Sequence, residues 1–494
     1  MIVDGRERDG ATFEGDVCVV GAGAAGLTLA VNLARRGVRV VLVESGGLKF
    51  DPQTQALLEV ELSGSTHEGL FQRARARYFG GTTNLWGGVC LPLDPFEFEQ
   101  HSWVPYSGWP ITRADLQPYY EAAAVQLGLK GVDSRYEPGA LGVAEHPRLI
   151  AAAESAVATT FPPRVPARRL RMGRWRREEV SAHPLIQCVL NTTIVELRAA
   201  AAGDSVTSLE GRTLAGGTLH FRARDYVLCT GAVENARLLL ASDSVTPGGL
   251  GNGTDQVGRY FMIHPPNGGG RILPLRPGVG RTQEEVLSDK YNVGWAVTPE
   301  ARREHELQGF HAFLFSNDLA DPLPFELAVR RLTRTGAGPR ADAAAVQRRG
   351  VLINWEQAPN PRSRVTLAST RDKLGMRKAH VHLDVTAEDL SRAQRSIELI
   401  GAAMARTGFA RLFFSDIANT PILGGGGHQM GTTRMSREPA DGVTDIHGRV
   451  HSVDNLFVSG SSLFPTGGWQ NPTFTIIALA LRQAEHLHAR TLDA

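Results

Sequence analysis

The spacing of hydrophobic residues changes twice near the N-terminus. The run Asp16–Val20 is almost entirely apolar, as in a buried strand, whereas Leu27–Arg36 places its apolar residues at helical intervals. A second apolar run follows over Val38–Glu44. A strand, a helix and a strand in this order predict a right-handed β-α-β unit whose two strands are parallel.

Four more segments of the first half have a clear pattern. Helical spacing predicts a helix over Asp115–Leu129, with Thr112 as its N-cap, and another over Glu234–Ser242. Apolar and β-branched residues predict strands over Ile186–Leu197 and Asp225–Thr230. Strands that alternate with helices predict an α/β fold.

The pattern is different between about residues 263 and 416. Strands such as Gly350–Glu356 and Ser363–Leu367 alternate polar and apolar residues, and one charged helix is predicted over Ala387–Thr407. Alternation of this kind is typical of an antiparallel sheet with one solvated face. We therefore expect residues 263–420 to form a second domain inserted into the first.

The end of the chain returns to the first pattern. Leu456–Ser459 is a short apolar strand, and a C-terminal helix is predicted from about Thr473 to Ala489. We expect residues 1–262 to form the first part of a cofactor-binding domain, with excursions toward the second domain around residues 90–185. Residues 421–494 would then complete that first domain.

Length and charge narrow the class of protein. The 494-residue chain is longer than one compact core, which favours two domains. A formal net charge of +2 indicates no overall attraction to nucleic acid, and no apolar run approaches the length of a membrane span. A local run of arginines between Arg330 and Arg349 is interpreted as a solvated helix or loop, with a gate over the active site or a contact for an acidic partner as the alternatives.

The cysteines and the N-terminus bear on the cellular compartment. Cys18 and Cys229 lie in apolar runs, where thiols behave as small hydrophobic groups, and neither Cys90 nor Cys188 has the spacing of a metal site. We expect no metal. Because this cysteine usage fits a reducing compartment and the charged N-terminus lacks the apolar core of a signal peptide, we predict a cytoplasmic protein.

A glycine-rich turn joins the first predicted strand to its helix. Gly21, Gly23 and Gly26 form the pattern GxGxxG, in which the glycines allow a tight turn, close approach to a pyrophosphate and packing of helix on strand. Glu44 ends the second strand, 18 positions after Gly26, where an acid can bind a ribose diol. The pattern predicts a dinucleotide site, with a ligand-free turn as the alternative.

A second glycine-rich loop over residues 80–88 favours FAD over NAD. An isoalloxazine is large and flat, so small residues let the backbone press against it while an aromatic residue such as Trp86 packs nearby. A structural turn around a core tryptophan is the alternative. Thr230 and Gly231, at a strand end before the predicted helix of Glu234, offer another close backbone approach.

Near the C-terminus, polar residues lie within two short frames of small residues. His428 lies in GGGGHQMGTTRM, and Asn471 lies 43 positions later in GGWQNPTFT. Together with the cofactor loop near the N-terminus, this polar pair suggests a redox enzyme whose two termini meet at one site. A buried structural histidine is the alternative for His428.

These motifs together resemble the glucose–methanol–choline (GMC) oxidoreductase family. The resemblance rests on seven segments in the family's order: VVGAGAAG, RYFGGTTNLWGG, SGWPITRADLQPYY, VLCTGAVENARLLL, VGRYFMIHP, EQAPNPRSRVTL, and HQMGTTRM with NLFVSGSSLFPTGGWQNPTFT. The branch that the chain resembles contains pyranose oxidases and bacterial sugar and aminosugar dehydrogenases. The resemblance implies an α/β fold with an FAD-binding Rossmann-like domain and an interleaved substrate domain built on an antiparallel sheet.

The resemblance also implies roles for individual residues. His428 and Asn471 match the family's catalytic pair. The match implies that His428 is the general base for the hydroxyl proton of an alcohol, and that Asn471 is the orienting hydrogen-bond donor. Ile194 matches a backbone contact to adenine, and Pro472 and Thr473 match positions that face the flavin. Together with the loops, it gives these cofactor-binding candidates: Gly21, Gly23, Ala24, Ala25, Gly26, Glu44, Ser45, Arg77, Gly80, Gly81, Thr82, Asn84, Leu85, Trp86, Gly87, Gly88, Ile194, Thr230, Gly231, Glu234, Gly460, Ser461, Asn471, Pro472 and Thr473.

One departure from the family pattern concerns Leu85. Pyranose oxidases attach FAD to a histidine at this position, and leucine has no nucleophilic atom for that link. We therefore predict FAD held without a covalent bond.

Substrate contacts are less well marked. Trp355, Gln357 and Gln470 are candidates for the substrate wall, and the carboxylates of Glu356 and Asp416 are candidates for binding a cationic substrate. His264, in RYFMIHP, matches a family motif of structural character. His447 and His451 lie near the glycine-rich return and are interpreted as structural or solvent-facing residues.

The resemblance implies oxidation of an alcohol on a sugar, glycoside or aminosugar by hydride transfer to flavin N5. An aldehyde product could continue through its hydrate to an acid. The alternatives are a hydroxynitrile lyase, a photodecarboxylase-type use of the fold, and a flavin-binding scaffold without turnover. The electron acceptor stays open between oxygen, a quinone and a protein.

Overall fold

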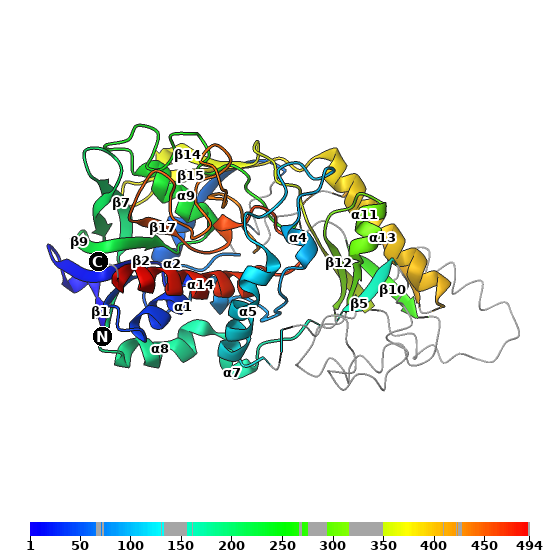
Figure 1. The fold of residues 1–494 in the computed structure, drawn as a ribbon, viewed down its shortest axis with the longest axis horizontal. Helices are drawn as coiled ribbons and strands as arrows, with labels where there is room; N and C mark the ends of the chain where they lie inside the picture. Colours follow the sequence, from blue (N-terminus) through cyan, green and yellow to red (C-terminus); the bar gives the residue numbers. More distant parts are fainter. Residues whose placement is uncertain are drawn as a thin grey trace, which may run out of the picture.

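The computed structural model describes residues 1–65, 71, 74–129, 131–132, 156–160, 162–265, 269–274, 294–315, 349–408, 410–420, 422 and 427–492. Two main hydrophobic cores organise these residues. The larger core surrounds an eight-stranded mixed sheet and the smaller one a six-stranded antiparallel sheet. The two sheets lie at opposite ends of an elongated molecule, and both termini lie at the end with the larger core (Figure 1).

The predicted β-α-β unit forms the centre of the larger sheet. β2 (Thr12–Val20) and β3 (Val40–Val43) are parallel neighbours, and α1 (Ala24–Ala34) connects them. The strands follow the order β1-β6-β3-β2-β9-β8-β7, and β17 pairs with β9. The remaining strands are β1 (Ile2–Asp4), β6 (Ile186–Leu190), β7 (Thr193–Ala199), β8 (Val206–Arg212), β9 (Thr218–Leu228) and β17 (Leu456–Val458).

One predicted strand is in fact two. The run Ile186–Leu197 breaks at Asn191, whose φ of 57° is a left-handed conformation that ends the extended backbone. β6 pairs in parallel with β3, whereas β7 pairs antiparallel with β8. The apolar residues on both sides of the break are buried, which is why their pattern alone predicted a single strand.

Three helices hold the two ends of the chain together. α14 (Thr473–Leu492) packs against α1 and against α5 (Arg113–Leu127), as Figure 1 shows for the red C-terminal helix. The predicted N-cap of α5 is confirmed, because the side chain of Thr112 accepts from the amide of Asp115 in a capping box. α8 (Met172–Ala182) also packs on α1. The C-terminal segment is thereby held beside the N-terminal glycine turn.

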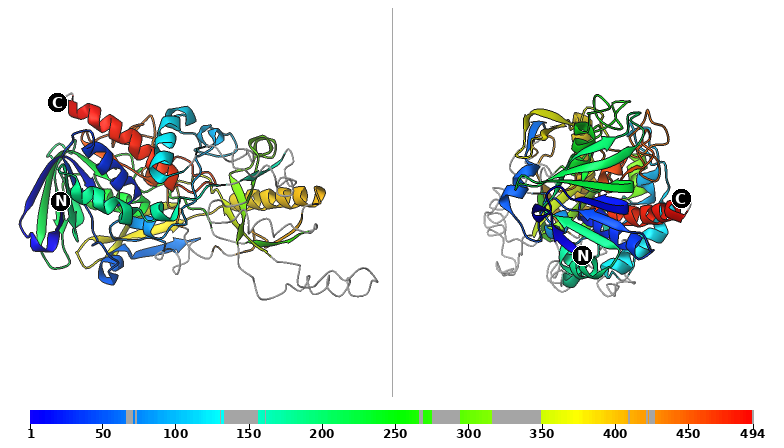
Figure 2. Two further views of the ribbon diagram at one scale, coloured as in Figure 1. Left: turned by 90° about the horizontal axis from the view of Figure 1, so that it is seen from below. Right: turned by 90° about the vertical axis from the view of Figure 1, so that its left-hand side faces the viewer.

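The smaller sheet is antiparallel throughout, as predicted. Its order is β16-β10-β13-β12-β11-β5, and α13 (Ala387–Arg406) packs across one face (Figure 2). Its strands are β5 (Val157–Thr160), β10 (Gly270–Pro274), β11 (Gly294–Val297), β12 (Phe310–Phe315), β13 (Arg349–Trp355) and β16 (Ala410–Phe414). β5 shows that the stretch before residue 185 does reach this sheet.

A third sheet corrects the expectation for the strand over Ser363–Leu367. β14 (Arg364–Arg371) pairs with β15 (Arg377–Leu383), which in turn pairs with β4 (Val60–Gly64). β14 and β15 pack on α9 (Ala232–Ala241) and belong to a sheet separate from the six-stranded one. Val365 and Val381 are fully buried in the larger core. The chain therefore returns to the first core inside the stretch 263–420, and the boundaries proposed for the domains stay a prediction.

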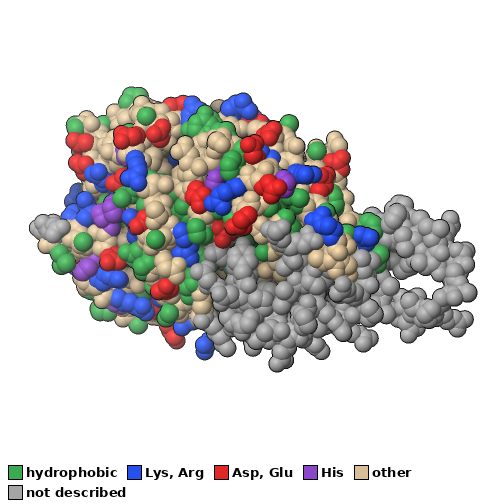
Figure 3. Space-filling model, turned by 45° about the vertical axis from the view of Figure 1, so that its right-hand side comes forward, with side chains coloured by type: hydrophobic (Ala, Val, Ile, Leu, Met, Phe, Trp, Pro, Cys, Tyr) green, Lys and Arg blue, Asp and Glu red, His purple; other side chains and the backbone are tan. Residues whose placement is uncertain are grey.

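Short helices complete the described part of the chain. They are α2 (Pro52–Gln55), α4 (Pro95–Phe98), α7 (Ala167–Leu170) and α11 (Pro299–Glu304), with 3-10 turns η1 (Gly5–Glu7), η2 (Ala56–Leu58), η3 (Gly81–Asn84) and η5 (Ser461–Leu463). Among the described helices, none is long and apolar enough to cross a bilayer. Basic and acidic side chains are interspersed on the face drawn in Figure 3. Arg330, Arg331, Arg334, Arg340 and Arg348 lie outside the described residues.

Candidate active site

A cavity of about 460 Å³ opens where the central parallel strands end. Its lining begins with the glycine turn after β2, continues through the ends of β3 and β9, and includes both the second glycine-rich loop and the C-terminal segment. Ligands of doubly wound sheets bind at the carboxyl ends of the strands, so the cavity lies where the fold predicts a binding site.

The three glycines of the turn have different tasks. Gly21 has a φ of 101°, and its N–H donates to the carbonyl of Val43 at 2.7 Å. A Cβ on Gly26 would lie 1.8 Å from the Gly21 carbonyl oxygen, so this glycine lets α1 pack on β2. A Cβ on Gly23 would meet only the Cα of Gly81, at 4.0 Å, because this position faces the cavity. The first turn of α1 carries no acidic residue, which leaves its positive end available to an anion.

Glu44 fixes the turn from the end of β3. One carboxylate oxygen accepts from the N–H of Ala22 at 2.8 Å and the other from the N–H of Gly46 at 2.9 Å. Burial raises the pKa of Glu44, and these two amides oppose that shift. The carboxylate is therefore held at the cavity edge beside Ser45, in the position expected of a ribose-binding acid.

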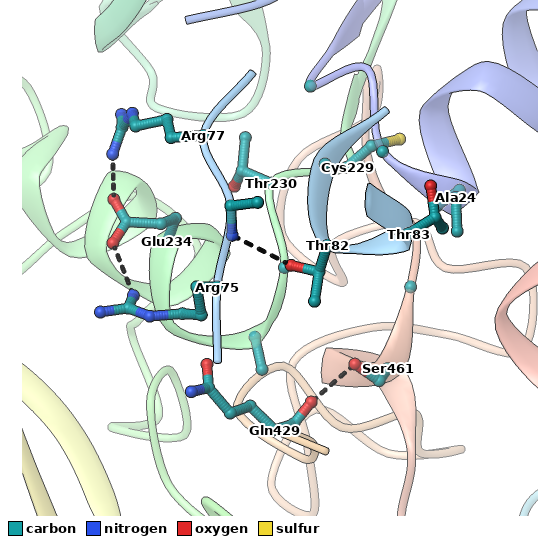
Figure 4. Close-up of a pocket in the computed structure, with 18 of the residues that line it drawn as sticks. Ala24, Arg75, Arg77, Thr82, Thr83, Cys229, Thr230, Glu234, Gln429 and Ser461 are labelled. Carbon is teal, nitrogen blue, oxygen red and sulfur yellow. Dashed lines mark hydrogen bonds and ion pairs between the residues drawn. The ribbon is translucent and has the colours of Figure 1, made fainter. Parts of the chain in front are cut away.

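Two arginines and a glutamate line one wall of the cavity. Glu234 lies between Arg75 and Arg77, at 3.2 and 3.3 Å, as Figure 4 shows. Burial alone would raise the pKa of Glu234, but three neighbouring guanidinium groups lower it to about 2. Arg75 was missed in the sequence, although it lies two residues before Arg77 and points to the same carboxylate.

The second glycine-rich loop packs directly on the first. A Cβ on Gly81 would lie 2.9 Å from the Cα of Gly23, so the glycine at position 81 is needed for this approach. Trp86 lines the cavity and its indole N–H donates to the carbonyl of Leu170. Leu85 also lines the cavity and is 49% exposed.

Three cofactor candidates do not line the cavity formed by the described residues. Gly26 has the packing role given above. Gly80 adopts a φ of 100°, and Asn84 donates its amide to the carbonyl of Phe79 at 3.0 Å. Both shape the second loop. The other cofactor candidates all line the cavity.

The C-terminal segment forms the opposite wall. His428 lines the cavity together with Gly460, Ser461 and the run from Asn471 to Thr473. The hydroxyl of Ser461 donates to the carbonyl of Gln429 at 2.6 Å, which ties the histidine segment to the turn after β17 (Figure 4). The structure thus brings the proposed catalytic pair and the N-terminal glycines to one cavity.

Both members of that pair have hydrogen-bond partners behind them. Nδ1 of His428 lies 2.8 Å from Nδ1 of His264, and burial lowers the pKa of His428 to about 4. The amide oxygen of Asn471 accepts from Asn354 at 3.2 Å, and its amide nitrogen lies 3.5 Å from the carbonyl of Val89. A histidine that is neutral at working pH can accept a proton, and an amide held by its oxygen presents its N–H groups.

The three substrate candidates lie outside this cavity. Trp355 is buried in the smaller core. The amide of Gln357 faces the N–H of Ile263 and the hydroxyl of Ser363, and Gln470 donates to Asp94 at 2.9 Å. Because these side chains are occupied by protein groups, their contact with a substrate stays a prediction without support from this geometry.

Other candidates have local structural roles. The carboxylate of Glu356 accepts from the N–H groups of Gly309 and Gly468, at 2.9 and 2.8 Å, and is not free for a cationic substrate. Asp416 is exposed and binds Asn419. His451 lies 2.9 Å from the hydroxyl of Ser436, and His447 stacks on another histidine ring.

The residues that the sequence did not indicate are mainly small or apolar parts of the lining. They include Leu58, Ala74, Ala76, Val89, Thr192, Thr193, Cys229, Val233, Leu238, Met376, Gln429, Ser459 and Ile476. Most are neighbours of indicated residues. Burial raises the pKa of Cys229, so this thiol stays protonated at neutral pH. Within the described residues no cluster of metal-binding side chains occurs.

The site defines the class of protein. The cavity fits FAD because Gly23, Gly231 and Gly460 leave open space where side chains would project, and because the N-terminus of α1 and the carboxylate residue Glu44 line the same space. A dinucleotide cavity that is also lined by a neutral histidine, His428, fits a flavin-dependent oxidoreductase.

Comparison with known proteins supports this class. A model of GMC oxidoreductases matches residues 359–480, and a model of the FAD binding domain matches residues 14–55. The chain is 28% identical to 6'''-hydroxyparomomycin C oxidase of Streptomyces lividus, over 98% of this chain and 94% of the relative. It is 27% identical to paromamine 6'-oxidase of Streptomyces fradiae, over 95% and 90%. Residues 359–480 thus carry the pattern of GMC oxidoreductases, and these findings together support an FAD-dependent alcohol oxidoreductase.

The fold is also found in solved structures. The structure matches pyridoxine 4-oxidase from Mesorbium loti with a TM-score of 0.64 and 19% identity, over 96% of this chain and 99% of that one. At this identity the likeness concerns the fold alone.

Proposed function

We propose that the protein oxidises an alcohol group of a sugar, glycoside or aminosugar, with His428 as the base and Asn471 as the hydrogen-bond donor. The observation that carries the proposal is the cavity itself, which is lined by His428 and Asn471 as well as by the glycines of the N-terminal turn. The substrate class is supported by two full-length relatives whose names describe oxidation of aminoglycosides.

In this proposal, His428 accepts the hydroxyl proton on its ring nitrogen Nε2. Asn471 donates a hydrogen bond to the same oxygen and holds the carbinol carbon toward the cofactor. Bound FAD supplies the acceptor for the hydride, so the carbon loses two electrons and its C–H bond while a carbonyl forms. Orientation of the carbon is a proximity effect and depends on the rigid C-terminal wall.

We further propose that FAD is held without a covalent bond. Leu85 lines the cavity at the position of the family's attachment site, and its side chain has no nucleophilic atom. The neighbouring thiol of Cys229 is kept protonated by burial, which weakens it as an alternative attachment point. The cytoplasmic location and the absence of a nucleic-acid partner stay predictions.

The test of the substrate class is an anaerobic screen. Purified yellow protein is mixed with paromamine, glucose, simple glucosides and aliphatic alcohols of similar size, and the flavin absorbance is recorded. We expect bleaching with at least one sugar or aminosugar and none with the aliphatic alcohols. Bleaching by the aliphatic alcohols alone would contradict the substrate class, and a failure of every alcohol to bleach would favour the lyase alternative.

The same samples identify the later steps. Oxygen or a quinone added to the bleached protein shows which of them restores the absorbance. The ratio of acceptor consumed to substrate shows whether oxidation stops at the aldehyde or continues to the acid.

A further inference from the structure

His264 lies opposite His428 because two distant segments pair at this point. Met262 and Met430 form an antiparallel bridge, with amide-to-carbonyl distances of 3.1 and 2.9 Å. In an antiparallel register, the residue two positions after Met262 faces the residue two positions before Met430. These residues are the two histidines, whose rings are nearly perpendicular at 81°.

The hydrogen bonds of His264 determine where its proton lies. Its Nε2 is 2.7 Å from the carbonyl oxygen of Gly468. A carbonyl oxygen only accepts, so Nε2 must carry the hydrogen. A neutral imidazole has one N–H, and Nδ1 of His264 is therefore an acceptor.

This assignment fixes the tautomer of His428. The two Nδ1 atoms are 2.8 Å apart, and one of them must donate. Because Nδ1 of His264 is the acceptor, Nδ1 of His428 carries the hydrogen and its Nε2 carries a lone pair. Among the described residues Nε2 of His428 has no hydrogen-bond partner, and the ring lines the cavity.

The environment keeps His264 in the neutral form that this arrangement needs. The ring is 3% exposed, and burial together with the neighbouring His428 lowers its pKa well below the usual value. A charged His264 would carry hydrogen on both nitrogens, and its Nδ1–H would force the other tautomer on His428. Nε2 of His428 would then be a donor and could not accept a proton.

Gly468, whose carbonyl oxygen accepts from His264, is itself held in place. The N–H of Gly468 donates to one carboxylate oxygen of Glu356 at 2.8 Å, and the other oxygen accepts from Gly309 at 2.9 Å. Gly468 has a φ of 59°, and a Cβ there would lie 2.4 Å from the side-chain oxygen of Gln470. Glu356 thus holds Gly468 through its N–H, and the N–H of Trp469, in the same peptide as the carbonyl that contacts His264, donates to Gln470 at 3.1 Å.

We propose that His264 is a positioning residue that sets the tautomer of His428, so that His428 presents Nε2 to the cavity as a proton acceptor. This inference rests on the proposed function, in which His428 takes the hydroxyl proton. After that transfer His428 carries hydrogen on both nitrogens, and its Nδ1–H still donates to neutral His264. The pair therefore accepts one proton without moving any other.

The test uses two variants of similar size. In His264→Asn the side-chain oxygen takes the place of Nδ1 and still accepts from His428, whereas His264→Leu removes the acceptor. We expect His264→Leu to lower the anaerobic rate constant of flavin reduction by roughly 10- to 100-fold, the loss typical of removing a group that orients a functional histidine. His264→Asn should stay within about fivefold of wild type, with KM changed little in both. Equal loss in both variants, or no loss in His264→Leu, would overturn the proposal.

A spectroscopic measurement makes the test independent of turnover and of the variants' folding. Two-bond proton–nitrogen correlation spectra of isotope-labelled histidine report the tautomer of each ring, and the His428→Ala variant assigns the signal of His428. We expect hydrogen on Nδ1 of His428 in the wild-type protein. Hydrogen on Nε2 would overturn the proposal.

These readouts separate this inference from the proposed function. If His428→Ala reduces its flavin as fast as wild type, the base assignment fails. If that variant is inactive but His264→Leu reduces its flavin as fast as wild type, only the role of His264 fails.

Discussion

Gly23 and Gly26 lie three residues apart in one turn, and the structure separates their roles. A methyl group at Gly26 would lie 1.8 Å from the carbonyl oxygen of Gly21, far inside the roughly 3.3 Å of a close C···O contact. The oxygen belongs to the backbone and cannot move away without shifting β2 or α1. We expect Gly26→Ala to lower the free energy of unfolding by about 3 kcal/mol, the upper end of ordinary overpacking costs.

A methyl group at Gly23 meets no such obstacle. Its nearest neighbour would be the Cα of Gly81 at 4.0 Å, and the backbone of Gly23, with φ of −87° and ψ of −162°, suits any residue. We expect Gly23→Ala to change the stability of the FAD-free protein by less than about 1 kcal/mol. Because the methyl group projects where the pyrophosphate is expected, the affinity for FAD should fall at least 100-fold, or about 2.7 kcal/mol.

The assay measures both properties in both variants. FAD-free proteins are unfolded in urea, and FAD is then titrated into the folded proteins while its fluorescence is recorded. Gly23→Ala should have a lower affinity for FAD and an unchanged urea midpoint, whereas Gly26→Ala should unfold at a lower urea concentration. Equal destabilisation of the two variants, or wild-type FAD affinity in Gly23→Ala, would refute the placement of the pyrophosphate beside Gly23.

Three further predictions concern the site and its pH dependence. Burial lowers the pKa of His428 to about 4, so the base stays neutral in mild acid, and the acid limb of kcat/KM should lie near pH 4. A limb near 6.5, the usual value of a histidine, would contradict this. Acid precipitation should leave the flavin in the supernatant, because Leu85 gives no link, and a yellow pellet would be the contrary result. Burial also lowers the pKa of His311 to about 3, from 6.5. Its neutral form contributes stability above about pH 6.5 that is lost as the pH falls, so His311→Gln should flatten the fall of the urea midpoint between about pH 6.5 and 4. An equal fall of the urea midpoint with pH in wild type and His311→Gln would contradict this prediction.

The sequence was informative where a motif is local. The β-α-β unit, its glycine turn and Glu44 all lie within a short stretch, and the structure arranges them as their pattern predicted. His428 and Asn471 could be indicated because each has a distinctive frame of small residues. Their meeting at the N-terminal turn depends on α14, whose long apolar stripe was visible as helical spacing.

Contacts that depend on register were not predictable. Nothing in RYFMIHP indicates that it pairs with HQM, yet this bridge alone places His264 against His428. Trp355 and Gln357 show the same limit, since a slip of one residue exchanges the two faces of a strand. The sequence left Glu356 as a candidate for binding a cationic substrate because its actual partners, the amides of Gly309 and Gly468, are remote in sequence.

The central claim is that His428 removes the hydroxyl proton of the substrate. The most direct measurement is the anaerobic single-turnover rate of flavin reduction in His428→Ala, with bound FAD matched to the wild-type content. The account predicts a fall of about 10²- to 10⁴-fold, the contribution typical of a general base, without loss of FAD. A rate within a few-fold of wild type would contradict it.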